Sequence, residues 1–222
     1  AAIALDTFSV TGTSDVTKLN NFFGLTEGVV TGTITDTTGT GGQYILSTSV
    51  AALNPGSSDQ ITVNIGTLTA SDDTITELIA LHNNGVVSVL GNVTATATRI
   101  GTLIASSSIT NSVNNIGYTL SNAIDVDDAA TLIGKVGSSG SVDFTNGVTD
   151  AFGKFVNSST NPSSLSTNFQ TVIGSGGDAN APVTISGTVD DTHKVGALNL
   201  LTSSSTHQGT VTATVEGNQA LL

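Results

Sequence analysis

The sequence predicts a β-rich α/β solenoid with short helices, mostly parallel strands and a repeat of about 25 residues. Three observations predict this class: β-alternating runs rich in Val and Thr recur along the chain, apolar pairs at helical spacing stand between them, and acidic residues precede most of these pairs. A unit of this kind cannot bury its apolar face alone, so neighbouring units must stack. The alternative is an all-β stack of sandwich-like domains, in which the apolar pairs lie in strands or loops.

Strands are predicted where Val, Ile or Ala alternates with Thr. In 30–35 the alternation places Val30, Gly32 and Ile34 on one face and three threonines on the other. The same division returns in three further runs and, in weaker form, in two shorter ones: 93–98, 183–189 and 211–215, then 61–65 and 142–144. These strands are therefore expected to form a sheet with one apolar and one Thr-rich face.

Short helices are predicted at seven apolar pairs, because residues three positions apart share a helical face. The pairs are Val16/Leu19, Val50/Leu53, Ile75/Leu78, Ile100/Leu103, Ala129/Leu132, Phe152/Phe155 and Val195/Leu198. Acidic residues stand just before most of them and are predicted to be N-caps, which satisfy free backbone N–H groups of the first turn: Asp15, Asp72, Asp73, Asp127, Asp128, Asp150, Asp190 and Asp191.

The intervals between these pairs predict the domain organisation. A repeat array is expected over 1–160 and again over 183–222, with a break over 161–182 that holds one degenerate unit. Pro162 and the Gly-rich stretch 174–177 interrupt the pattern there. Residues 219–222 are expected to begin a further half-unit, so that the array would end without the polar cap of a solenoid terminus.

Composition excludes several classes of partner. The chain of 222 residues has 17 Asp and Glu against five Lys and Arg, a net charge of −12. Nucleic acids and anionic membranes need clustered cations, whereas the five cations here are scattered: Lys18, Arg99, Lys135, Lys154 and Lys194. Without cysteine there is no disulfide framework, and no run approaches the roughly 18 apolar residues that insert into a bilayer. An acidic, Thr-rich, cysteine-free chain favours an extracellular location.

No catalytic arrangement stands out, and an enzyme is not expected. His82, His193 and His207 share no metal-binding spacing and are predicted to lie on the surface. The chain has no Gly-x-Ser-x-Gly elbow, and its Gly-rich stretch at 174–177 lacks the lysine that follows a phosphate-binding loop. The sequence therefore predicts no catalytic and no cofactor-binding residues.

Calcium is the alternative to capping at one place. Asp125, Asp127 and Asp128 offer three carboxylates within four residues, and Ca²⁺ takes six to eight oxygen ligands. Capping explains these residues more simply, because each helix needs a cap and the chain lacks both the EF-hand spacing and the Gly-Gly-x-Gly-x-Asp repeats of calcium β-rolls. Apart from Ca²⁺ at these three residues, no cofactor is predicted.

The pattern resembles the Thr/Val/Gly-rich repeat arrays of large secreted or cell-surface proteins of aquatic bacteria, including cyanobacteria. Residues 15–35 and 72–89 carry the resemblance best, since each reads as an acidic turn, a short apolar helix and a Val/Thr strand. The resemblance implies an extracellular or cell-surface structural role and names no ligand.

The expected function is an extracellular repeat protein that self-assembles into a filament, fibre or surface layer. Its expected partner is another copy, with cell-surface polysaccharide as a further candidate, although two Tyr and seven Phe leave few rings on which sugars could stack. The alternatives are a calcium-stiffened adhesin or binding module, a phage appendage, and an ice-binding solenoid whose Thr rows face the ice.

Overall fold

The computed structural model describes residues 8–12, 16–25, 28–35, 52–190 and 192–216. Contacts divide the chain into two compact units. Unit 1 comprises residues 1–118 and 135–141, and unit 2 comprises residues 119–134 and 142–222. The fold is α/β, with parallel strands and short helices in both units.

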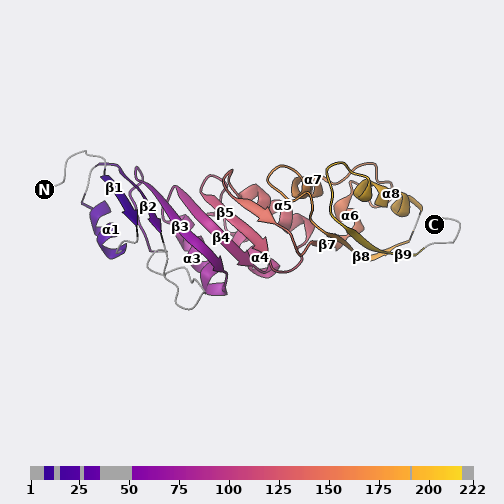
Figure 1. The fold of residues 1–222 in the computed structure, drawn as a ribbon, viewed down its shortest axis with the longest axis horizontal. Coiled ribbons are helices and arrows are strands. Elements are labelled where there is room, and N and C mark those ends of the chain that lie inside the picture. The colour runs from indigo at the N-terminus through magenta and orange to yellow at the C-terminus, as the bar shows by residue number, and fades with distance from the viewer. Residues whose placement is uncertain (1–7, 13–15, 26–27, 36–51, 191, 217–222) are drawn as a thin grey trace. The chain divides into compact units, whose positions relative to one another are not determined.

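The larger sheet follows chain order (Figure 1). Its strands are arranged β1-β2-β3-β4-β5-β6, and the recorded registers of β1–β2, β2–β3 and β3–β4 are parallel. Helices stand between most neighbouring strands, and the elements are β1 (Phe8–Gly12), α1 (Val16–Phe23), β2 (Val30–Thr35), β3 (Gln60–Thr69), α3 (Asp72–Asn83), β4 (Ser88–Ala95), α4 (Ala97–Ala105), β5 (Asn114–Leu120) and β6 (Ser141–Asp143). The division between the units crosses the chain within β5 and β6.

Burial alternates along the strands of unit 1. In β3, Ile61, Val63 and Ile65 are buried, whereas the residues between them are partly exposed. Helices α3 and α4 lie against each other and contribute the matching apolar side chains, among them Leu78 and Leu103. One face of the sheet therefore lies in the core, and the other is polar and open as far as the described residues go, which is unusual because most parallel sheets are covered on both faces.

Unit 2 contains a second parallel sheet of three strands in the order β7-β8-β9. Its elements are α5 (Val126–Lys135, of which Lys135 belongs to unit 1), β7 (Val148–Ala151), α6 (Phe152–Phe155), α7 (Thr167–Ile173), β8 (Val183–Val189), α8 (Thr192–Thr202) and β9 (Val211–Val215). In its core the rings of Phe155 and Phe169 meet edge to face with centroids 5.2 Å apart.

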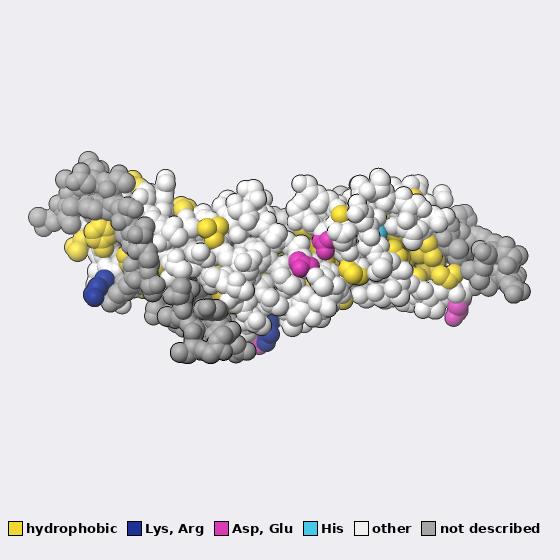
Figure 2. All heavy atoms as spheres, in the orientation of Figure 1, with side chains coloured by type: hydrophobic (Ala, Val, Ile, Leu, Met, Phe, Trp, Pro, Cys, Tyr) yellow, Lys and Arg dark blue, Asp and Glu magenta, His cyan; other side chains and the backbone are white. Residues whose placement is uncertain are grey.

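The face of the molecule drawn in Figure 2 carries few charged side chains.

The helices largely follow the predicted apolar pairs. Six of the seven pairs lie in α1, α3, α4, α5, α6 and α8. At the seventh pair, Val50 lies outside the described residues, and Leu53 is fully buried without belonging to a helix. Helix α7 was anticipated only as a degenerate unit. The all-β alternative is wrong, because helices and strands alternate along the chain.

The acidic residues cap fewer helices than predicted. Hydroxyl groups of Ser71, Thr96 and Ser166 accept the capping hydrogen bonds of α3, α4 and α7. Asp72, Asp73, Asp127 and Asp128 lie instead inside the first turns, where a negative charge still favours the helix dipole. Asp15 and Asp191 lie outside the described residues, as do residues 219–222.

Two predicted strands differ in detail. The strand expected over 93–98 ends at Ala95, because Thr96 caps α4 and the following residues are helical. In β8, Gly187 was expected on the apolar face, yet it is exposed with φ of 78°. The pairing of β8 with β9 shifts register between Thr184 and Thr188, so the alternation of faces is interrupted there.

Candidate functional site

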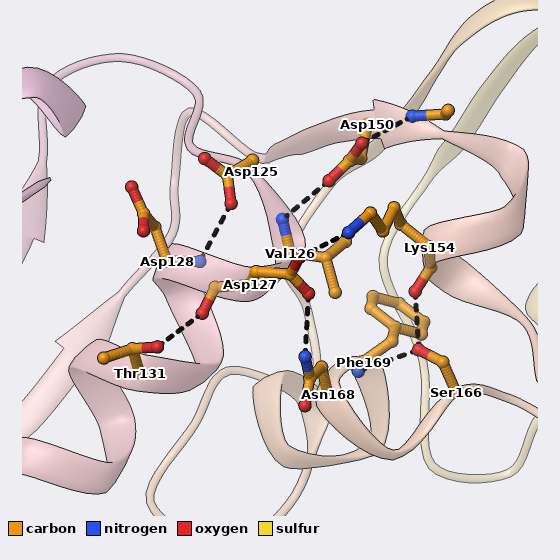
Figure 3. Close-up of polar contacts among 11 residues, drawn as sticks. Asp125, Val126, Asp127, Asp128, Thr131, Asp150, Lys154, Ser166, Asn168 and Phe169 are labelled. Atoms are coloured by element: carbon orange, nitrogen blue, oxygen red, sulfur yellow. Dashed lines mark hydrogen bonds and ion pairs between the residues drawn. The ribbon is translucent and has the colours of Figure 1, made fainter.

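Four acidic residues of unit 2 lie around the N-terminus of α5: Asp125, Asp127, Asp128 and Asp150 (Figure 3). Asp125 caps this helix, since its Oδ1 accepts a hydrogen bond of 2.8 Å from the backbone N–H of Asp128. Asp127 points the other way, toward α6 and α7. Its Oδ2 forms an ion pair with Lys154, and its Oδ1 accepts a hydrogen bond of 2.7 Å from Asn168.

Two further residues complete this cluster. Asp150 Oδ2 accepts a hydrogen bond of 3.3 Å from the N–H of Val126, which is the first residue of α5. Ser166 caps α7 and also donates a hydrogen bond to the carbonyl oxygen of Lys154. The cluster therefore links α5, α6 and α7 through polar contacts at the ends of these helices.

The surroundings of the two aspartates shift their pKa values in opposite directions. The hydrogen bond from Lys154, followed by that from Asn168, lowers the pKa of Asp127 below its ordinary value. The pKa of Asp128 is raised, first by burial and then by the negative charge of Asp125. The pKa of Lys154 is raised by the hydrogen bond to Asp127.

The three predicted calcium ligands do not share one point. Asp125 binds a backbone N–H and Asp127 binds two side chains of other helices. Over the described ranges, no group of three or more His, Asp or Glu residues is arranged to hold a metal ion. Calcium at Asp125, Asp127 and Asp128 stays a prediction, and the chelator experiment below tests it.

The open face of unit 1 carries rows of polar side chains across the strands. The register aligns Thr33 with Thr62 and Thr62 with Ser88, and the amide of Asn115 in β5 donates a hydrogen bond of 3.0 Å to the hydroxyl of Ser88. Adjacent strands are about 4.8 Å apart, so neighbouring side chains of a row lie within mutual reach.

A polar groove of about 420 Å³ lies on this face. Three asparagines from successive strands line it, together with glycines, hydroxyl side chains and one leucine: Asn64, Asn92, Asn115, Gly66, Gly91, Gly117, Thr67, Ser139, Ser141 and Leu90. None of these side chains is charged. The groove begins where β3 shifts register against β4, between Asn64 and Thr67, and Gly66 has φ of 66° there.

Two histidines predicted on the surface are buried instead. His82 is 7% exposed and His207 is 4% exposed. His82 lies on the apolar face of α3, four residues after Leu78, whose carbonyl oxygen it contacts at 2.7 Å. That spacing could have revealed its burial. His193 belongs to α8, but its side chain is outside the described part.

His207 is held by contacts that no local pattern indicates. Its Nδ1 lies 3.0 Å from the carbonyl oxygen of Leu201, and its Nε2 lies 3.0 Å from that of Ala181. The ring also packs edge to face on Phe169. The side chain thus fixes the loop between α8 and β9 against the start of β8.

A buried polar network in unit 1 also has no sequence signal. Asn114 is fully buried; its amide donates to the carbonyl oxygen of Lys135 and its Oδ1 accepts a hydrogen bond of 3.0 Å from the Tyr118 hydroxyl. Burial raises the pKa of Tyr118 well above its ordinary value. Lys135 in turn donates to the carbonyl oxygens of Ser106 and Ile109. These groups are satisfied internally, so they serve the fold.

None of the helices in the described ranges has both the length and the apolar character needed to cross a membrane. Comparisons of the chain with protein-family models, with curated proteins and with solved structures give no match.

Proposed function

We propose that this chain is an extracellular structural repeat protein without enzymatic activity, which stacks its units along parallel sheets and self-assembles into a filament, fibre or surface layer. The observation that carries the proposal is the sequence separation of its long-range polar contacts. In a repeat protein each unit contacts mainly its neighbours in the sequence, so contacts between units span about one period.

Many contacts within each unit span 26 or 27 positions. They include two ion pairs, Arg99 with Asp72 and Lys154 with Asp127, each separated by 27 positions. The two pairs occupy equivalent places, because each joins an aspartate in the first turn of one helix to the third residue of the next helix. Further contacts repeat the spacing: Asn115 with Ser88 at 27, and Lys135 with Ile109, Asn146 with Leu120 and His207 with Ala181 at 26.

The strand order supports the same proposal. The strands of each sheet follow chain order, the pairs β1–β2, β2–β3, β3–β4, β7–β8 and β8–β9 are parallel, and a helix stands between most neighbours. Each crossover connection then advances the sheet by one strand, as stacking of equivalent units requires. Polar, uncharged rows on the open face of unit 1 suit a hydrated exterior.

The outer edge of β9 supports self-assembly. Within the described residues β9 pairs only with β8. The carbonyl oxygen of Thr210 accepts a hydrogen bond from the N–H of Val183, and the N–H of Glu216 donates to the carbonyl oxygen of Val189, so the backbone groups of these two residues point toward β8. Because these groups alternate sides along a strand, the N–H of Ala213 points away from β8. Val211, Ala213 and Val215 are partly exposed, so the edge offers both unpaired backbone and apolar side chains to another strand.

The test removes one outward N–H group without touching the β8–β9 pairing. The Ala213→Pro variant is expected to lose assembly and to keep its circular dichroism spectrum, because proline lacks the N–H donor. Sedimentation velocity over a concentration series, with negative-stain electron microscopy, measures assembly. The matched control is Thr167→Pro at the first position of α7, which tolerates proline and should assemble like the original chain.

Repeating the assembly measurement with a calcium chelator distinguishes the self-assembling scaffold from the calcium-stiffened module. Assembly of the original chain that survives chelator supports the scaffold and assigns the aspartates to their helix contacts. Assembly that is lost on chelation favours the calcium-stiffened module instead. A monodisperse monomer at high concentration, with calcium and without it, contradicts self-assembly.

A further inference from the structure

The polar groove on the open face of unit 1 has the composition of a ligand site. Its volume of about 420 Å³ falls within the range of small-molecule pockets, roughly 300–1,000 Å³. Three successive strands each contribute one asparagine to it: Asn64 belongs to β3, Asn92 to β4 and Asn115 to β5. The same kind of side chain thus recurs at about one repeat spacing along the groove.

Two of the three amides are held in place. Asn64 Oδ1 accepts a hydrogen bond of 2.9 Å from the N–H of Gly66, which leaves its NH₂ group free to donate. Asn115 donates to Ser88 and accepts from the N–H of Ser139 at 3.3 Å. Because these contacts fix the side chains before any ligand binds, a ligand loses little affinity to their ordering.

The third amide has its hydrogen-bonding groups available. Among the described residues, the side chain of Asn92 makes no hydrogen bond, and neither does the hydroxyl of Thr67 or Ser141. Gly117 provides the space for this arrangement. A Cβ atom at Gly117 would lie 2.6 Å from Asn92 Oδ1 and 3.3 Å from the Ser141 hydroxyl.

The floor of the groove is kept free of side chains. Gly91 has φ of 138°, and a Cβ atom there would lie 2.5 Å from the carbonyl oxygen of Gly66. The backbone therefore requires a glycine at position 91, and neither Gly66 nor Gly91 places a side chain in the groove, so a ligand can approach the backbone of the sheet closely there.

From these features we infer that the groove binds a neutral, polyhydroxylated ligand of the oligosaccharide class. An amide both donates and accepts, so it matches adjacent hydroxyl groups of a sugar, whereas the lining offers no charge to an anionic or cationic ligand. In a chain of net charge −12, acidic polysaccharides are further disfavoured. The inference does not depend on self-assembly.

The lining also sets the expected strength of binding. Sugar sites with high affinity stack rings on aromatic side chains, and the lining contains none. We therefore expect a dissociation constant on the order of 1 mM for a single groove. Because no ion pair is involved, the constant should hardly change with salt concentration.

The experiment is a two-dimensional ¹⁵N NMR titration of the full chain with cellohexaose, laminarihexaose and mannohexaose, and with an alginate hexamer as the anionic comparison. At least one neutral sugar is expected to shift the side-chain NH₂ signals of Asn64, Asn92 and Asn115 in a saturable way, and the alginate hexamer is not. Asn92→Ala should weaken binding about fivefold, the effect of one neutral hydrogen bond.

Matched variants keep the test decisive. Asn180→Ala removes an exposed asparagine of unit 2 and should leave the dissociation constant unchanged. Gly117→Ala keeps every hydrogen-bonding group but displaces Asn92, so it should weaken binding as Asn92→Ala does. The inference is overturned if no neutral sugar shifts these signals, if Asn92→Ala binds normally, or if the groove signals respond only to protein concentration, which would make the groove a contact between copies.

Discussion

At the scale of single residues, glycines that look equivalent in the sequence differ in the space around them. Gly134 lies in α5 with no atom within 4 Å of the position that a Cβ would take. A Cβ at Gly177 would lie 2.0 Å from the carbonyl oxygen of Val172. The first glycine is therefore replaceable, and the second is required by close backbone approach.

We predict that Gly134→Ala stabilises unit 2 by about 1 kcal/mol, because alanine restricts the unfolded chain and favours the helix. Gly177→Ala should destabilise the same unit, since the backbone of α7 would have to move. The midpoint of urea unfolding measures both. Equal effects of the two substitutions would show that the space around these glycines does not control stability.

His82 makes stability depend on pH. Burial lowers the pKa of His82 below its ordinary value of 6.5, and the hydrogen bond to Leu78 only partly opposes this. Among the described residues, its Nε2 is buried without a hydrogen-bond partner. The unfolded chain takes up a proton below about pH 6.5, while the folded chain keeps the ring neutral.

The stability associated with His82 is therefore complete above about pH 6.5 and is lost as the pH falls below it. We predict that the urea midpoint of unit 1 falls between about pH 7.5 and pH 5.5 and that His82→Gln removes this part of the change. Unfolding monitored by hydrogen exchange of α3 assigns the effect to unit 1. A midpoint that drops equally in the variant would contradict the assignment.

At the scale of elements, the side chain of Asp127 in α5 contacts residues of both α6 and α7. Asp127 contacts both Lys154 and Asn168, whereas Asp72 in the equivalent place of unit 1 contacts Arg99 and is 89% exposed. Both ion pairs are substantially exposed, so each contributes little by itself and is screened by salt. The additional hydrogen bond from Asn168 distinguishes Asp127 from Asp72.

We predict that Asp127→Asn lowers the melting temperature more than Asp72→Asn does, and that the difference shrinks at high salt. Because the pKa of Asp127 is lowered in the folded chain, its contribution is present above its ordinary pKa and is lost as the pH falls through the folded value. Melting curves by circular dichroism at two salt concentrations and two pH values measure these effects. Equal losses in both variants would remove the special role of Asp127.

Much of the element pattern could be predicted because it is local. The apolar pair Ile75/Leu78 identifies α3, and the alternation of Val and Thr identifies β2. Which residue caps each helix is harder to predict, because Ser, Thr and Asp all accept the same hydrogen bond and the chain is rich in each. Thr96 belongs to the predicted strand 93–98 because it continues the alternation of that run, although it caps α4.

At the scale of the whole molecule, the residue contacts of the chain divide it into two compact units. Proteins can open locally in cooperative parts while the remainder stays folded. A substitution in one compact unit is therefore expected to affect mainly that unit.

We predict that Gly177→Ala lowers the hydrogen-exchange protection of α7 and β8 and leaves that of α3 and β4 unchanged. Exchange measured by mass spectrometry on peptides from both units resolves the two responses. Ser203→Ala, at an exposed residue directly after α8, is the control within unit 2. A uniform loss of protection in both units would show one cooperative body instead.

The sequence by itself determined where most helices lie and, for the strands that it predicts, which face largely enters the core, because alternation and the spacing of three are properties of consecutive residues. It did not indicate β1, β5 and β7, whose residues lack the repeated Val/Thr alternation of the predicted runs. Only the tertiary structure decided that Asn64, Asn92 and Asn115 line one groove, that Asp127 meets two other helices, and that His207 is buried between two carbonyl oxygens. Apart from the contact of His207 with Leu201, six positions away, these contacts join residues that are distant in the sequence. The distances between the three asparagines depend on strand register and on the register shift near Gly66, which no local pattern of residues specifies.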